Sequence, residues 1–225
     1  MLFRSAARVN ASWGQPFEMV KPGASYKQYP CCYSTHAAIE AALTLTRKHG
    51  AFDAATIAKV ETGTPALGLS YTKRPQPQSD LDAKFSVQYC VTRALTESKV
   101  VLEYFENEAF KQRVPRCLLP RVHSQLYTGQ MFDPVDPFDA ELRLTLTDGH
   151  VFQAKVDRPL GCTSDIPIPF DQPKAKYEDC AGRVLTRDVV ARSLPVIDCA
   201  KKECSVSDLS EVIESGVLHE SGFSF

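Results

Sequence analysis

Apolar residues recur at helical spacing close to the start of the chain. The pattern consists of Ala37, Ala38, Ile39, Ala41, Ala42, Leu43 and Leu45. Ser34 or Thr35 can cap such a helix, because a side-chain oxygen can accept a hydrogen bond from a free backbone N–H. The lysine, histidine and glycine at 48–50 are typical of a helix C-terminus. The pattern therefore predicts a helix that follows directly on a loop.

A second helical pattern at residues 85–95 predicts another helix, for which Asp80 or Asp82 offers a capping carboxylate. Between the two helices, Ile57 and Val60 stand among polar residues. We expect a strand at that position.

Alternation of apolar and polar residues marks the middle of the chain. Residues 142–146 and 151–156 alternate, and Asp148 and Gly149 lie between them. An Asp-Gly dipeptide between alternating segments is the strongest short-range signal for a hairpin. The pattern predicts two paired antiparallel strands.

Helical patterns return near the C-terminus. Residues 177–197 form one, which we expect Pro195 to break, and another helix is expected to begin at Ser207 or Asp208. The order helix, strand, helix, hairpin, helix predicts an α+β fold class. The expected architecture is a two-layer sandwich in which helices cover one face of an antiparallel sheet.

The composition excludes some classes of function. The chain has 225 residues, of which 44% are hydrophobic and 24% charged, and its net charge is −1. This charge gives no basic field for nucleic acid or an anionic membrane. No apolar run approaches the ~18–20 residues that span a bilayer. We expect neither nucleic acid nor a membrane as a partner.

Two features bear on the cellular compartment. The N-terminal residues include Arg4 and Arg8 and have no acid before Glu18, which fits either an ordinary domain start or the tail of a transit peptide. The eight cysteines are Cys31, Cys32, Cys90, Cys117, Cys162, Cys180, Cys199 and Cys204. They lack the spacing of a disulfide scaffold and indicate mostly buried free thiols. We expect a cytoplasmic protein, with the mitochondrion as the alternative.

The stretch YKQYPCCYSTH at 26–36 concentrates groups that are capable of chemistry. Cys31, Cys32 and His36 are soft metal ligands, but adjacent cysteines rarely reach one tetrahedral ion, and no CxxC pair lies elsewhere. We therefore expect no metal. Alternatively, a thiol before a helix N-terminus has a depressed pKa and could act as a nucleophile, with His36 as its base.

The same stretch also allows two other interpretations. Lys27, the free N–H groups of the helix start and the hydroxyls of Ser34 and Thr35 could together bind a carboxylate. The simplest alternative is that both cysteines pack in the core and Lys27 is solvated. The residue pattern alone leaves all these alternatives open.

Three motifs, in the right order, resemble the MmgE/PrpD family. The first is K-x-Y-P followed by a histidine and an alanine-rich helix, formed here by residues 27–45. The second is KFSVQY at 84–89, and the third combines the hairpin and RPLG loop at 142–161 with KYEDCAGRVL at 176–185. The family includes 2-methylcitrate dehydratase, cis-aconitate decarboxylase and iminodisuccinate epimerase.

The resemblance implies chemistry without a metal or an organic cofactor. Family members move a proton next to a carboxylate of a small di- or tricarboxylate, which requires cations and hydrogen-bond donors at the site. Carried over by position, Lys27 and Tyr89 match catalytic residues, and Lys27 also binds the substrate. The expected substrate-binding residues also include Cys32, Ser34 and His36. The resemblance matches Cys32 and His36 to family positions, with His36 more structural, and Ser34 comes from the carboxylate-binding interpretation of the loop. Cys32 stands where the decarboxylase branch has a histidine, which favours a dehydratase, isomerase or epimerase.

The resemblance also implies that part of a family enzyme is absent. Family members are about twice this length and begin with a large helical domain. We therefore expect a lead-in at 1–12, an α+β domain at 13–178 and a helical segment at 179–225 that would pack on such a domain. The expected partner is a helical domain of the family or a second copy of this chain. The alternative is a truncated, non-catalytic member that acts as a binding or assembly module.

Overall fold

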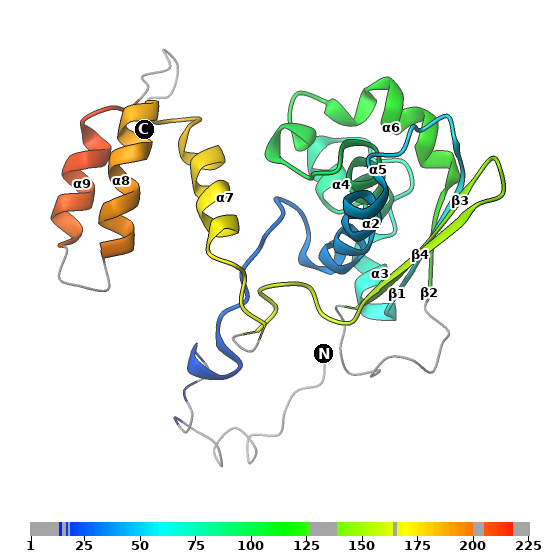
Figure 1. Ribbon diagram of the computed structural model, residues 1–225, viewed down its shortest axis with the longest axis horizontal. Helices are drawn as coiled ribbons and strands as arrows, with labels where there is room; N and C mark the ends of the chain where they lie inside the picture. The colour runs from blue at the N-terminus through cyan, green and yellow to red at the C-terminus, as the bar shows by residue number, and fades with distance from the viewer. Residues whose placement is uncertain are drawn as a thin grey trace. The chain divides into compact units, whose positions relative to one another are not determined.

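The computed structural model describes residues 14, 17, 19–126, 139–163, 166–199 and 205–217. Contacts divide the chain into two compact units, Met1–Pro167 and Ile168–Phe225. Figure 1 labels their helices and strands. The predicted division at 13–178 and 179–225 remains a prediction.

The first unit contains a four-stranded sheet with the order β2-β1-β3-β4. The strands are β1 (Ile57–Thr64), β2 (Val122–Leu126), β3 (Ala140–Leu146) and β4 (Val151–Val156). β3 is antiparallel to β1 and β4, which confirms the predicted hairpin, whereas β1 and β2 are parallel. The sheet is therefore mixed rather than purely antiparallel.

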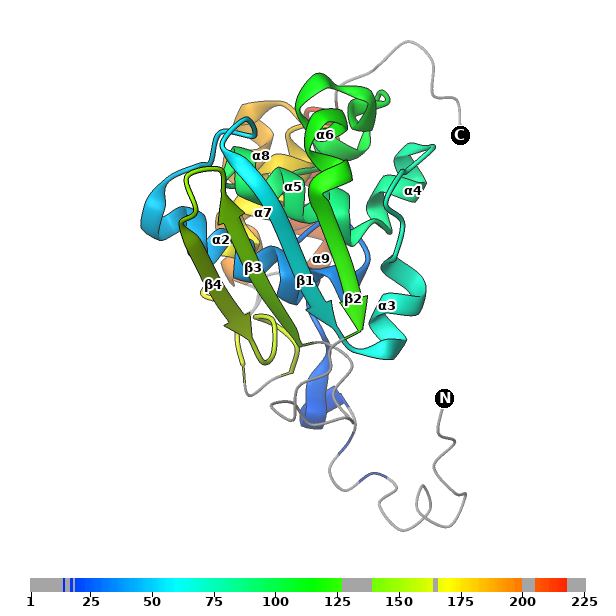
Figure 2. The same cartoon turned by 90° about the vertical axis from the view of Figure 1, so that its right-hand side faces the viewer.

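Helices cover one face of this sheet (Figure 2). The helices of the first unit are α2 (His36–His49), α3 (Ala66–Thr72), α4 (Asp80–Lys84), α5 (Val87–Glu97) and α6 (Arg113–Leu118). α2 packs on β3 and β4, and α5 packs on α2 and β2. Apolar side chains from both layers form one buried core that includes Ile39, Ile57, Leu95, Leu142 and Leu144. The predicted α+β class with helices on one face is confirmed.

Short helical turns complete the first unit. They are η1 (Met19–Gly23), η2 (Tyr33–Thr35), η3 (Leu102–Phe105), η4 (Ala109–Lys111) and η5 (Leu119–Arg121). η2 leads directly into α2. As predicted, α2 ends at Gly50, which adopts a positive φ of 82° and donates its N–H to Thr46 O.

The second unit consists of α7 (Asp171–Ala181), α8 (Arg187–Cys199) and α9 (Val206–Glu214). Its small core is Ala181, Leu185, Val189 and Val190, against which Tyr177, Val212 and Ile213 pack. The chain breaks at 182–186 rather than at Pro195, which lies inside α8. A proline removes one backbone hydrogen bond, and the packing of α8 on α9 keeps the helix in spite of that loss.

Several helix caps differ from the prediction. The helical pattern at 85–95 forms α5, which Ser86 Oγ caps rather than Asp80 or Asp82. Those two residues lie in the separate helix α4, which Ser79 Oγ caps by accepting from the backbone N–H of Asp82. The Asp82 carboxylate instead accepts from Gln78 N and pairs with Arg74. Local sequence could not reveal this competing use of the carboxylate.

Other caps differ in the same way. Ser205 begins α9 in a capping box with Asp208, one turn earlier than expected for a cap at Ser207 or Asp208. Thr35 stands at the N-cap of α2 but makes no side-chain cap, because η2 has already placed it in helical conformation. Its hydroxyl donates to Cys32 O instead.

Candidate functional site

The loop at 26–36 is anchored to two other parts of the first unit. Tyr26 N donates to Gly161 O at 2.8 Å, and Cys32 N donates to Lys84 O at 2.8 Å. The second bond joins the first and second family-like motifs through backbone atoms. The loop is therefore held in place before it enters α2.

The predicted binding residues on this loop differ in exposure. Lys27 is exposed, Cys32 and Ser34 are partly buried, and His36 is fully buried. A ligand from solvent can reach Lys27 directly. His36, at the first position of α2, lies beneath the loop and can act on such a ligand only through its neighbours.

His36 lies against two tyrosine rings. Its ring centroid is 5.0 Å from that of Tyr29, in an edge-on arrangement, and 4.7 Å from that of Tyr33. Neither ring nitrogen of His36 reaches hydrogen-bond geometry with a partner in the described part of the chain, although the ring lies close enough to the Cys31 thiol to lower the pKa of that thiol. A buried imidazole without a well-formed hydrogen bond is costly, so the two tyrosine rings and the Cys31 thiol are the contacts that hold it.

A pair of thiols lies beside this histidine. Cys31 Sγ is 3.1 Å from Thr35 Oγ1. Burial raises the pKa of the Cys31 thiol, but polar interactions with Cys90 and then with His36 outweigh that effect and lower the pKa to about 5. Burial and Cys31 raise the pKa of the Cys90 thiol well above its ordinary value. The perturbed thiol is thus Cys31, and it is almost fully buried.

A carboxylate lies one turn along α2 from His36. Glu40 Oε1 accepts a 2.9 Å hydrogen bond from Leu160 N, in the loop after the hairpin. Burial raises the pKa of the Glu40 carboxyl, and this hydrogen bond opposes the shift. Burial and then Glu40 raise the pKa of Tyr29. Glu40 is the only charged residue within 37–45, a signal in the sequence that could have singled it out.

Tyr89 lies in a different set of contacts. It is fully buried in α5, and its hydroxyl donates to Tyr104 O at 2.5 Å while accepting from Arg93 Nε at 3.0 Å. Arg93 also donates to Ala109 O and to Gln112 Oε1. Burial raises the pKa of Tyr89, and Arg93 opposes the shift. In this structure the tyrosine hydroxyl ties α5 to η3.

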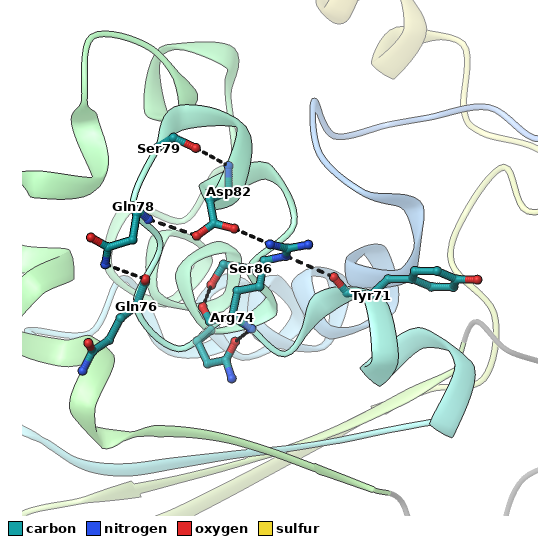
Figure 3. A network of polar contacts seen from close by, with 8 residues as sticks. Tyr71, Arg74, Gln76, Gln78, Ser79, Asp82 and Ser86 are labelled. Atoms are coloured by element: carbon teal, nitrogen blue, oxygen red, sulfur yellow. Dashed lines mark hydrogen bonds and ion pairs between the residues drawn. The ribbon is translucent and has the colours of Figure 1, made fainter.

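The rest of the KFSVQY motif fastens the proline-rich loop to the core (Figure 3). Ser86 Oγ donates to Arg74 O at 2.5 Å and also caps α5. Gln88 Oε1 accepts from Arg74 N at 3.2 Å, and its Nε2 donates to Ser124 Oγ at 2.6 Å. The motif is thus explained by hydrogen bonds that close the fold. The motif named Gln88 without a structural role, and Arg93 was not singled out from the sequence, because the partners of both residues are distant in the chain.

Metal sites, free thiols and membrane-spanning helices were sought among the described residues. Among them, no group of three or more histidine, cysteine or acidic residues could hold a metal. Six cysteines in that part are free: Cys31, Cys90 and Cys162 are buried, Cys32 is partly buried, and Cys117 and Cys180 are exposed. No helix there is long and apolar enough to cross a bilayer.

Comparison with known proteins adds the family. Residues 29–202 match the family model of the MmgE/PrpD C-terminal domain. The chain belongs to the MmgE/PrpD family. It is 25% identical over 190 residues to the cis-aconitate decarboxylase of Mus musculus and 24% identical over 189 residues to that of Homo sapiens. Each comparison covers 81% of this chain and 38% of the relative, so the chain spans less than half the length of these MmgE/PrpD proteins.

Proposed function

We propose that this chain is part of a cofactor-independent lyase or isomerase that acts on a small di- or tricarboxylate, in the manner of 2-methylcitrate dehydratase. The observation that carries the proposal is the family match over residues 29–202. Two relatives are decarboxylases of cis-aconitate, itself a tricarboxylate, which supports the substrate class. Because those relatives are much longer, the activity is proposed for the chain joined to a helical domain.

Lys27 is the proposed carboxylate-binding residue. Its side chain is exposed on the loop at 26–36, which the bond from Cys32 N to Lys84 O anchors. A charge-assisted hydrogen bond from an ammonium group to a carboxylate contributes about 1.5–3 kcal/mol. Cys32 and Ser34, on the same loop, are partly buried. His36 would act by positioning this loop rather than by touching the substrate.

Tyr89 is the second proposed catalytic residue, on the strength of the family pattern. Its hydroxyl is engaged by the Tyr104 carbonyl and by Arg93. To donate a hydrogen bond to a substrate, it would have to exchange the Tyr104 carbonyl for a substrate oxygen. Binding to a helical domain would have to provide that rearrangement.

Cys32 bears on the type of reaction. The decarboxylase branch has a histidine at the matching position, and a partly buried thiol is a weaker hydrogen-bond donor than an imidazole. This substitution favours dehydration or isomerisation over decarboxylation. Both relatives named above are cis-aconitate decarboxylases, so the preference for dehydration or isomerisation rests on Cys32 alone.

The proposal is tested with 2-methylcitrate, citrate, cis-aconitate and iminodisuccinate, followed by absorbance and NMR. We expect no turnover at an enzymatic rate by this chain alone, and turnover of one substrate when the remaining part of the mouse relative is supplied. In that assembly Lys27→Ala should raise KM, and Tyr89→Phe should lower kcat. Lys73→Ala, at another exposed lysine, is the control. Full activity of a Lys27→Ala, Tyr89→Phe double variant would refute the site.

A binding or assembly module is the second candidate. One observation favours it: a groove of about 810 Å³ on the second unit, lined in part by Phe170, Leu194 and Pro195. Exposed apolar faces on Val189, Val190 and Leu194 would also support a module, but Val189 and Val190 are buried and Leu194 is partly buried. Mass measurement in dilute solution, with and without a separately expressed helical domain, separates the two. Complex formation without turnover of any substrate would favour the module.

A further inference from the structure

A second cavity lies in the first unit and is built from other elements than the loop at 26–36. Its volume is about 710 Å³, within the range of about 300–1,000 Å³ that is usual for small-molecule sites. The walls come from the proline-rich loop after α3, from η4 to η5, and from the start of β2. They comprise Pro75, Gln76, Pro77, Gln78, Phe110, Lys111, Arg116, Leu119, Pro120, Val122 and His123.

The ionisable groups in this lining are all basic. Lys111, Arg116 and His123 contribute to it, and no carboxylate does. Three acids that contact or face lining residues are paired. Glu108 pairs with Lys111, Asp82 pairs with Arg74, and Glu61, which faces His123 in the sheet register, pairs with Lys59.

Arg116 is the cation that remains available in this lining. Its guanidinium has no ion pair or side-chain hydrogen bond in the described part of the chain. The five N–H donors of an arginine match the oxygens of a carboxylate or a phosphate. The cavity therefore has a donor group for an anion.

The remaining lining is mainly apolar. Three prolines, Phe110, Leu119 and Val122 provide flat or aliphatic surface. Two glutamine side chains supply amide donors and acceptors. A bare inorganic ion would leave this surface unused, whereas an anion attached to a ring would cover it.

The loop that forms one wall is fixed in advance (Figure 3). Gln78 N donates to Asp82 Oδ2 at 3.0 Å, and Gln78 Nε2 donates to Gln76 O at 2.9 Å. Asp82 also pairs with Arg74, which Gln88 and Ser86 hold by its backbone. A wall that is already ordered loses little entropy when a ligand binds.

We propose that this cavity binds an organic anion of mononucleotide size, in which a phosphate or carboxylate meets Arg116 and a planar ring lies on the proline and phenylalanine surface. The site is independent of the proposed carboxylate site at Lys27. The two can therefore be occupied and disabled separately.

The test is an NMR titration of the ¹⁵N-labelled full chain at constant ionic strength. The probes are adenosine monophosphate, phthalate and inorganic phosphate. We expect shift changes confined to residues 75–78 and 110–123 with at least one ring-bearing probe. Arg116→Gln should weaken that binding about tenfold or more, because a charge-assisted hydrogen bond is lost. Phosphate and carboxylate sources are distinguished by which probe binds more tightly.

The matched control is Arg113→Gln, which removes the same charge from an exposed position of α6 outside the cavity. Equal weakening by both variants would overturn the proposal in favour of diffuse electrostatics. Inorganic phosphate binding as tightly as both ring-bearing probes would also overturn it, as would the absence of localised shifts. Lys27→Gln should leave the titration unchanged, so the outcome does not depend on the proposed enzymatic function.

Discussion

Gln88 in α5 donates a 2.6 Å hydrogen bond from Nε2 to Ser124 Oγ in β2. The same amide accepts from the backbone N–H of Arg74, so one side chain joins a helix, a loop and an edge strand. Gln88 is almost fully buried, and both of its contacts close segments that lie far apart in sequence. This glutamine is therefore a structural member of the family-like motif.

Replacing Gln88 should destabilise the first unit. Gln88→Ala leaves the Ser124 hydroxyl and the Arg74 N–H without partners, and each buried group left unsatisfied costs about 1–3 kcal/mol. We expect a loss of about 2 kcal/mol or more in the free energy of unfolding, measured by urea denaturation. Gln125→Ala, on the exposed part of β2, should change it by less than about 0.5 kcal/mol. Equal effects would contradict the assigned role.

Tyr89→Phe should lower stability even where no substrate is present. The change removes the donor to Tyr104 O and the acceptor of Arg93 Nε, with an expected cost of about 1–3 kcal/mol. Tyr71→Phe, at an exposed hydroxyl, is the matched control and should be nearly neutral. A fully stable Tyr89→Phe protein would show that this contact contributes nothing to the fold.

Glu40→Gln should change how stability depends on pH. Burial raises the folded-state pKa of this carboxyl above its ordinary value of 4.5. A raised pKa contributes stability that is fully present below the ordinary value and is lost as pH rises through the folded value. Glutamine keeps an oxygen for Leu160 N but has no charge. We expect the variant to lose less stability from about pH 4 to about pH 8 than the parent does.

Urea denaturation across this pH range provides the measurement for Glu40→Gln. Glu61→Gln, at a partly exposed glutamate of β1, is the control. Superimposable pH profiles for the parent and Glu40→Gln would show that the carboxyl does not titrate differently in the folded state.

The reactivity of the cysteines should follow exposure rather than pKa. Cys117 and Cys180 are exposed, whereas Cys31 is buried although its pKa is lowered to about 5. A thiolate must be reached by the reagent before its pKa matters. Among the six cysteines whose exposure the structure describes, we expect an alkylating reagent at neutral pH to label these two first, as read by mass spectrometry of peptides. Labelling of Cys31 at the rate of Cys117 in the folded protein would contradict the burial of this thiol.

Replacing Gly149 in the hairpin turn should lower the free energy of unfolding. Its φ is +90°, and a Cβ atom built there would meet nothing within 4 Å. The cost of Gly149→Ala is therefore backbone strain alone, expected at about 1 kcal/mol. Gly149→Asn should cost less, because asparagine tolerates positive φ better. Thermal unfolding of both variants tests this ranking, and an alanine variant as stable as the parent would refute it.

The sequence pattern predicted those helices and strands whose formation depends on residues close together in the chain. The β3–β4 hairpin and helix α2 follow from alternation, an Asp-Gly turn and a C-terminal glycine. Strand β2 was missed, because the five residues VHSQL carry no alternation over a useful length and pair with β1 far upstream. The contacts that hold β2 are the bond from Gln88 to Ser124 and the burial of Val122 in the core, and both form only in the folded chain.

The candidate site was predictable only in part. Lys27 is exposed and His36 is buried at the helix start, but sequence could not show that His36 lies against two tyrosine rings and the Cys31 thiol. The interaction of Cys31 with Cys90 joins distant positions, and no spacing rule connects them. For Tyr89, the motif fixed the position in α5 while the contacts with Arg93 became evident only from the packing of η3 and η4.

The parallel pairing of β1 with β2 has a consequence for the order of folding. Only residues 147–150 separate β3 from β4, whereas residues 65–121, which include α3 to α6, separate β1 from β2. Longer loops lose more entropy on closure, and non-local pairing slows folding. During synthesis β1 emerges before either of its partners. The backbone N–H and C=O groups of β1 therefore stay unpaired until both neighbouring strands have been made. We expect this strand to be the most aggregation-prone segment of the nascent chain.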